Sequence, residues 1–121
     1  MLGLRTAIYK VGDIVKATEW YAKAFKTKPY FNEPFYVGFN IGGYELGLQP
    51  EENPTTEKPE SVTALWGVDD IHAEYNYLLE LGATVFEVPT NVGGELMVAS
   101  VKDPWGNILG LIYNPEFKNP S

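Results

Sequence analysis

The sequence predicts an α+β protein built from two tandem βαβββ modules, and two internal repeats support this prediction. Residues 6–14 (TAIYKVGDI) align with residues 63–71 (TALWGVDDI) at a constant offset of 57, with five of nine positions identical. A shorter repeat closes each half, with Leu-Gly-Leu at 46–48 and again at 109–111. We therefore expect one domain of 121 residues that contains a first module over 4–49, a linker loop over 50–60 and a second module over 61–114.

Each half begins with an apolar run typical of a strand, followed by an aspartate, Asp13 or Asp70. Because an aspartate carboxylate accepts from the free N–H groups of a first helical turn, we expect a helix to begin after each one. Residues that could face a core then recur at helical spacing in both halves. They are Ile14, Thr18, Tyr21 and Phe25 in the first half, and Ile71, Tyr75, Leu78 and Leu79 in the second.

Three strand-like segments complete each half, at about 28–33, 35–41 and 44–49 and at about 84–88, 96–102 and 107–113. Gly82 is a plausible helix stop, and the segment 103–107 (DPWGN) is typical of a turn, because proline sets φ and glycine tolerates a positive φ. Half of this chain is too small to bury both faces of its sheet. We therefore expect the halves to form a curved eight-stranded sheet around a cavity, with the helices outside.

Composition excludes several classes of function. The chain has no cysteine and one histidine, His72, so disulfides, thiolate zinc sites and cysteine nucleophiles are excluded. A net charge of -7 disfavours binding to nucleic acid or to anionic membranes. Residues 51–121 carry a charge of -9, which is compatible with attraction of a cationic small molecule or with a merely solubilising surface. No apolar leader is evident at the N-terminus, and we expect a cytoplasmic protein.

The order of several motifs resembles the vicinal oxygen chelate superfamily, which includes glyoxalase I, extradiol dioxygenases, fosfomycin-resistance enzymes and bleomycin-resistance proteins. The resemblance covers roughly residues 4–114. The segments that carry it are Val11-Gly12-Asp13, Glu19-Trp20-Tyr21, Val68-Asp69-Asp70-Ile71 and Asp103-Pro104-Trp105-Gly106-Asn107. The resemblance implies the paired-module fold predicted above and, from its bleomycin-resistance members, a homodimer with ligand grooves between subunits.

Metal-dependent members of this superfamily hold a divalent ion with His or Glu side chains from the first and last strands of each module. The equivalent positions in this sequence are occupied by Thr6, Gly47, Thr63 and Gly110. Hydroxyls are weak ligands for the metals concerned, and glycine has no side chain to offer. Glu45 is the only nearby carboxylate. The sequence therefore predicts no metal site, unless a partner chain contributes ligands. It also predicts no cofactor, and it identifies no catalytic residue.

Strand alternation predicts which side chains line the cavity. They combine an apolar floor with glycines and a few polar groups, as small-molecule sites do. The candidate ligand-binding residues are Thr6, Ile8, Lys10, Glu45, Gly47, Gln49, Thr63, Leu65, Ile108, Gly110 and Ile112. The alternative is that these side chains fill a closed sheet, with Lys10 and Glu45 paired at the rim. Which face the aromatic residues of 35–41 occupy stays open, and His72 is expected on the outer helix with no role.

The sequence therefore supports three hypotheses about function. The first is a metal-free binding protein for a drug or metabolite, similar to the bleomycin-resistance members. The second is an enzyme with a rearranged metal site that uses Glu45, either a glyoxalase-like lyase or isomerase or an extradiol-type dioxygenase. The third is a structural or regulatory domain that binds no ligand.

Overall fold

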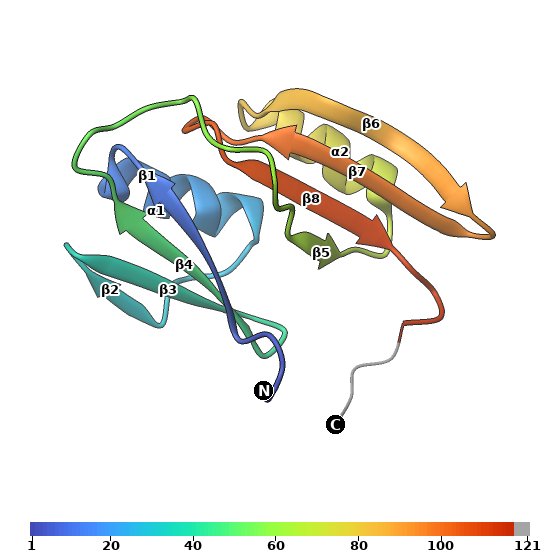
Figure 1. Ribbon diagram of the computed structural model, residues 1–121, viewed down its shortest axis with the longest axis horizontal. Helices are drawn as coiled ribbons and strands as arrows, with labels where there is room; N and C mark the ends of the chain where they lie inside the picture. The colour runs from blue at the N-terminus through green and yellow to red at the C-terminus, as the bar shows by residue number, and fades with distance from the viewer. Residues whose placement is uncertain (118–121) are drawn as a thin grey trace. The chain divides into compact units, whose positions relative to one another are not determined.

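The computed structural model describes residues 1–117, and the chain divides into two compact units, Met1–Glu57 and a second unit that begins at Lys58 (Figure 1). Within the described residues, each unit has one helix and one four-stranded mixed sheet in the order βαβββ. This confirms the predicted fold class of two tandem βαβββ modules. The joining of the two sheets around a cavity stays a prediction.

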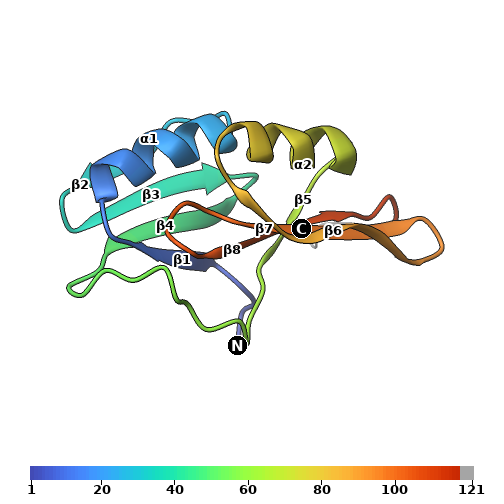
Figure 2. The ribbon, with the colours of Figure 1, turned by 90° about the horizontal axis from the view of Figure 1, so that it is seen from above.

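The first unit consists of β1 (Thr6–Val11), α1 (Ile14–Ala24), β2 (Phe31–Glu33), β3 (Tyr36–Ile41) and β4 (Tyr44–Pro50). Its strand order is β1-β4-β3-β2, with β1 parallel to β4 and the other pairs antiparallel. The helix crosses from one edge strand, β1, to the other, β2, and so covers one face of the sheet (Figure 2).

Aromatic and aliphatic side chains fill the space between α1 and this sheet. The helix buries Ala17, Tyr21 and Ala24, which recur at the three- and four-residue spacing of one helical face. Tyr21 stacks on Tyr9 of β1 with 5.7 Å between ring centroids, so Tyr9 lies on the helix side of the sheet. Other strand residues are buried in the same unit. They are Val11, Val37, Phe39, Leu46 and Leu48.

Both helices begin where the sequence predicts. The side chain of Asp13 accepts a hydrogen bond from the backbone N–H of Lys16 at 3.1 Å, and Asp70 accepts one from Ala73 at the same distance. Each carboxylate thereby satisfies one of the free N–H groups of a first helical turn. The second helix ends before Gly82, which has a φ of +100°, as expected of a glycine stop.

The second unit consists of β5 (Leu65–Gly67), α2 (Ile71–Glu80), β6 (Thr84–Gly93), β7 (Leu96–Lys102) and β8 (Ile108–Tyr113). Its strand order is β5-β8-β7-β6, with β5 parallel to β8. Strand β5 begins later than the repeat predicts, and Thr63 lies exposed in the loop that precedes it. The backbone N–H of Gly110 still bonds the carbonyl of Ala64 at 3.1 Å, so pairing extends only one residue before the strand.

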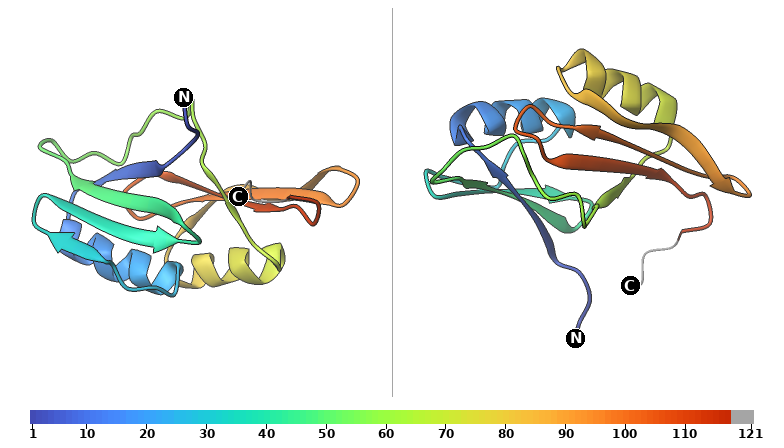
Figure 3. Two further views of the ribbon diagram at one scale, coloured as in Figure 1. Left: turned by 90° about the horizontal axis from the view of Figure 1, so that it is seen from below. Right: turned by 45° about the horizontal axis from the view of Figure 1, so that its top comes forward.

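Strand β6 is longer than the expected 84–88 and forms a hairpin with β7 (Figure 3). Three register shifts interrupt this hairpin, and one of them lies between Glu87 and Thr90, where Pro89 is located. A proline has no N–H for the ladder, so it is tolerated in an edge strand at a bulge. The proline therefore interrupts the ladder locally without ending the strand.

The predicted turn between β7 and β8 is closed by a buried carboxylate. Asp103 is 4% exposed and accepts hydrogen bonds from the backbone N–H groups of Trp105 at 2.9 Å and Asn107 at 2.8 Å. The side-chain amide of Asn107 adds a third bond at 3.0 Å, and Gly106 has a φ of +85°. The turn therefore needs both its aspartate and its glycine.

The start of the second unit is held by two lysines. The ammonium of Lys58 donates to the carbonyl of Trp105 at 2.5 Å, and Lys102 forms an ion pair with Glu60 at 2.7 Å. The last residues of the predicted linker therefore pack on the second unit. Within residues 1–117, neither helix has the length and hydrophobicity needed to cross a bilayer.

Candidate functional site

Six of the predicted site residues share the face of the first sheet opposite α1. Because Tyr9 contacts the helix and neighbouring side chains alternate, Thr6, Ile8 and Lys10 point away from it. The β1–β4 register aligns these three with the predicted site residues of β4 on the same face. The pairs are Thr6 with Glu45, Ile8 with Gly47 and Lys10 with Gln49.

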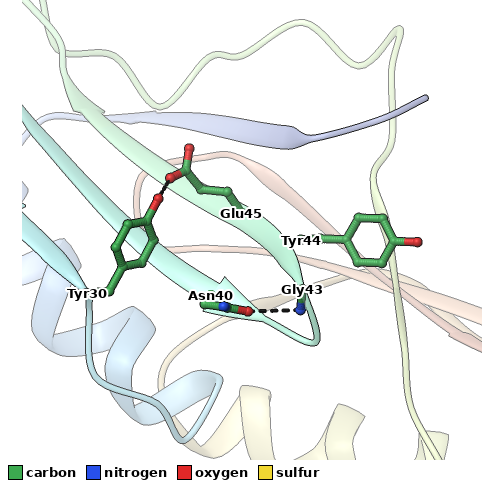
Figure 4. Close-up of a pocket in the computed structure, with 5 residues that line it drawn as sticks. All are labelled: Tyr30, Asn40, Gly43, Tyr44 and Glu45. Atoms are coloured by element: carbon green, nitrogen blue, oxygen red, sulfur yellow. Dashed lines mark hydrogen bonds between the residues drawn. The ribbon is translucent and has the colours of Figure 1, made fainter. Parts of the chain in front are cut away.

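Glu45 is the polar centre of this face. Its Oε1 atom accepts hydrogen bonds from the Tyr36 hydroxyl at 2.6 Å and from the Thr6 hydroxyl at 3.1 Å. The Tyr30 hydroxyl donates to Oε2 (Figure 4). Glu45 therefore bonds three neutral hydroxyls.

Two glycines make room for the tyrosines that reach Glu45. Gly38 and Gly47 lie opposite each other on β3 and β4. A Cβ atom at Gly38 would lie 3.3 Å from the ring of Tyr30, and a Cβ at Gly47 would lie 2.8 Å from Cζ of Tyr36. Since real Cβ atoms rarely approach so closely, each tyrosine ring lies where a larger residue would place its side chain.

The hydroxyl of Tyr36 is held in its donor form. Tyr36 is half-buried, and this burial raises the pKa of its phenol above the ordinary value of 10.0. The hydroxyl therefore keeps its proton throughout the neutral range and goes on donating to Glu45.

A small hollow lies beside Glu45, at the hairpin end of β3 and β4 (Figure 4). It has a volume of about 140 Å³ and is lined by Tyr30, Asn40, Gly43, Tyr44 and Glu45. The side chain of Asn40 accepts from the backbone N–H of Gly43 at 2.8 Å and so ties the hairpin. The ring of Tyr44 points away from the other side chains, so Tyr30 and Glu45 provide the polar wall.

The sequence did not identify Tyr30 and Tyr36 as site residues. Tyr36 lies on the Glu45 face, whereas Val37 and Phe39 of the same strand are buried on the opposite side. This resolves the orientation that the sequence left open for 35–41. The alternation of Tyr36 with Val37 along the strand predicts only that their side chains lie on opposite faces of the sheet. Which of the two faces carries Glu45 is known only once the register of β3 with β4 is known.

The other five predicted site residues belong to the second unit. Leu65 pairs with Gly110, and a Cβ at Gly110 would lie 2.6 Å from the side chain of Leu65 and 3.0 Å from that of Thr63. Strand alternation places Ile108 and Ile112 of β8 on the same face as Gly110. The structure thus groups the candidates into two sets, one in each unit, and a shared cavity stays a prediction.

The donors at the superfamily's metal positions do not fit a metal ion. Thr6 uses its hydroxyl as a donor to Glu45, Thr63 is exposed, and Gly47 and Gly110 offer no side chain. Residues 1–117 contain no group of three or more His, Cys, Asp or Glu side chains able to hold a metal. His72 lies exposed in the first turn of α2.

Comparison with known proteins establishes the family. The sequence profile of the Glyoxalase/Bleomycin resistance protein/Dioxygenase superfamily matches residues 4–111, and the chain belongs to this superfamily. It is similar to the uncharacterized protein YurT of Bacillus subtilis (strain 168), with 36% identity over 77 residues that span 58% of this chain and 60% of YurT.

Solved structures share the fold. A glyoxalase-related enzyme from Fulvimarina pelagi aligns with a TM-score of 0.78 at 17% identity and covers 95% of this chain and 90% of that one. The fosfomycin resistance protein FosX from Mesorhizobium loti aligns with a TM-score of 0.74 at 15% identity, with coverages of 96% and 95%. At such identities the likeness concerns the fold and not the activity.

Proposed function

We propose that this protein binds a small organic molecule without a metal ion, on the face of the first sheet that carries Glu45. The observation that supports this most is the bonding of the Glu45 carboxylate to three hydroxyls, from Thr6, Tyr30 and Tyr36. These bonds hold the carboxylate in one orientation, so a ligand would meet a preorganised acceptor.

The hollow beside Glu45 sets the size of the group that enters it. An apolar cavity of about 150 Å³ accommodates a benzene ring, and this hollow measures about 140 Å³. It therefore suits one ring-sized part of a ligand whose remainder lies over the open sheet. Metabolites and antibiotics both contain groups of this size.

A fragment screen by ¹H–¹⁵N NMR tests this proposal. The full chain, with excess EDTA, is titrated with ring-sized fragments of different charge. We expect hits to shift the amide signals of the β3–β4 hairpin, including Gly43 and Glu45, and we expect Glu45→Gln to weaken them. Glu80→Gln, an exposed position on α2, removes the same charge and is the matched control.

A metal-dependent lyase, isomerase or dioxygenase makes the opposite prediction. Protein purified without chelator would contain stoichiometric Ni, Zn, Mn or Fe, and Glu45→Ala would release it. Such a result, or binding that occurs only after metal is added, would overturn the proposal. So would a screen without any hit in the hairpin.

Assembly and location are further proposals. The resemblance to bleomycin-resistance proteins supports a homodimer, which light scattering coupled to size-exclusion chromatography would test by showing twice the mass of 13.5 kDa. The cytoplasmic location expected from the sequence stays a prediction.

A further inference from the structure

We infer that the ligand of this site is an organic cation whose N–H groups bond Glu45 and whose flat apolar body lies on the aromatic side chains of the β2–β3 hairpin. The inference rests on the proposed function and narrows the class of ligand. It depends on two observations. The first is that the hydrogen-bond partners of the Glu45 carboxylate are neutral hydroxyls. The second is a set of aromatic side chains beside it, here called the aromatic cluster, in which Tyr36 is half-buried and Tyr30, Phe31 and Phe35 are exposed.

The Glu45 carboxylate has one unused position for a donor. A carboxylate offers about four acceptor positions, two on each oxygen. The structure fills two on Oε1, from Thr6 and Tyr36, and one on Oε2, from Tyr30. The remaining position on Oε2 can be used only by a group that donates a hydrogen bond, which selects N–H and O–H groups in the ligand.

The charge of Glu45 favours a cationic donor over a neutral one. Its three partners within the described residues are neutral hydroxyls. The guanidinium of Arg5, the residue that precedes Thr6, donates to backbone carbonyls, including that of Leu2 at 3.0 Å. A ligand that binds at Glu45 displaces water from the carboxylate, so the negative charge loses part of its hydration. Only a cationic ligand compensates for this loss.

Aromatic rings form a surface next to this carboxylate. Phe31 contacts Phe35 with 6.1 Å between ring centroids and Tyr36 with 6.3 Å. Phe31 is opposite Gly38 in the β2–β3 pair and therefore shares the Glu45 face. Tyr30 and Phe35 are 64% and 67% exposed, so their ring faces are accessible.

This aromatic cluster complements the same class of ligand. Ring faces carry partial negative charge and attract organic cations at separations of up to about 6 Å. They also stack on flat apolar groups. An anion gains no cation–π attraction and is repelled by Glu45, so the site discriminates by charge as well as by shape.

The test compares three probes of one shape and different charge, which are benzylammonium, benzyl alcohol and benzoate at pH 7. Each is titrated into the full chain and followed by NMR shifts in the β3–β4 hairpin. We expect benzylammonium to bind about tenfold more tightly than benzyl alcohol, as one charge-assisted bond predicts, and benzoate to cause no shift. Raising the salt concentration is expected to weaken benzylammonium alone.

Two variants assign the effect to residues. Glu45→Gln keeps the shape of the side chain and is expected to make benzylammonium bind no more tightly than benzyl alcohol, whereas Glu80→Gln preserves the tenfold difference. Phe35→Ala is expected to weaken both probes by about threefold or more, because it removes an exposed ring from the cluster.

The outcomes separate this inference from the proposed function. If benzyl alcohol or benzoate binds as tightly as benzylammonium, or if Glu45→Gln leaves the tenfold difference intact, the cation inference is wrong and the binding function stands. If none of the probes and none of the screened fragments shifts the hairpin, both fail.

Discussion

Substitution of Gly47 by alanine tests the central packing feature of the site. The new Cβ would lie 2.8 Å from Cζ of Tyr36 and 3.0 Å from Cε1, and the Tyr36 hydroxyl would be nearer still. Carbon atoms in contact normally lie about 3.5–4.0 Å apart, so the ring must move by roughly 1 Å. That movement carries the hydroxyl away from Glu45, to which it donates at 2.6 Å.

Two opposing effects determine the change in stability. Alanine has less backbone freedom than glycine in the unfolded chain, which stabilises the folded state by about 0.5–1 kcal/mol. Overpacking destabilises by about 1–3 kcal/mol, and a hydrogen bond to a charged group contributes about 1.5–3 kcal/mol, less here because Tyr36 and Glu45 are only half-buried. We expect a net destabilisation of about 2 kcal/mol.

Urea unfolding followed by tryptophan fluorescence measures this change, and calorimetry is expected to show a fall in Tm of roughly 8 °C. Gly67→Ala is the matched control, because a Cβ there meets nothing within 4 Å and its φ is not positive. The control is expected to leave stability unchanged or to raise it by up to about 1 kcal/mol.

A double-mutant cycle assigns the clash to Tyr36. Tyr36→Phe removes the hydroxyl, the atom that the new Cβ meets first, so Gly47→Ala is expected to destabilise the Tyr36→Phe variant by about 1 kcal/mol less than it destabilises the wild type. Our account of the packing is refuted if Gly47→Ala is as well tolerated as Gly67→Ala, or if the cycle shows no coupling.

Two further predictions concern the second unit. Asp103→Ala is expected to lower stability by about 3 kcal/mol, because it leaves the buried N–H groups of the turn without their acceptor. Urea unfolding measures this loss, with the exposed Asp69→Ala as a control that changes stability by less than about 0.5 kcal/mol. Tyr75→Phe is expected to be neutral or to stabilise by up to about 1 kcal/mol, because the buried Tyr75 hydroxyl has no partner within residues 1–117. Burial also raises the pKa of Tyr75 above 10.0, so the folded state holds this proton more tightly than the unfolded state. Wild-type stability should therefore fall as pH rises above about 10, with a smaller slope in Tyr75→Phe, and an unchanged slope would contradict this account.

The local sequence was sufficient to predict the elements. The repeated aspartates, Asp13 and Asp70, cap the two helices, and the glycines at 82 and 106 adopt the positive φ that a helix stop and a turn require. These features depend on contacts within a few residues, so they can be identified without knowledge of the rest of the chain.

Strand limits were less accurate where they depended on pairing. Thr63 was expected in a strand by analogy with Thr6, yet β5 begins only at Leu65. Strand β6 continues past Pro89, because a register shift in an edge strand accommodates a residue without an N–H. In both cases pairing with a neighbouring strand determines where the strand begins or ends. The residue preferences of the strand itself do not predict these limits.

The residues of the site also fall into those that the sequence identified and those that only the structure revealed. The resemblance to the superfamily placed Thr6 and Gly47 at one predicted site, and strand alternation added Glu45, which lies two residues before Gly47 on the same face. It did not identify Tyr30 and Tyr36, which precede Glu45 by 15 and 9 residues. Their convergence on Glu45 depends on the alignment of Gly38 with Gly47 across β3 and β4, and a shift of one residue would turn Tyr36 to the other face. Only the tertiary structure decides that alignment, because register arises from packing between strands and not from the preferences of either strand.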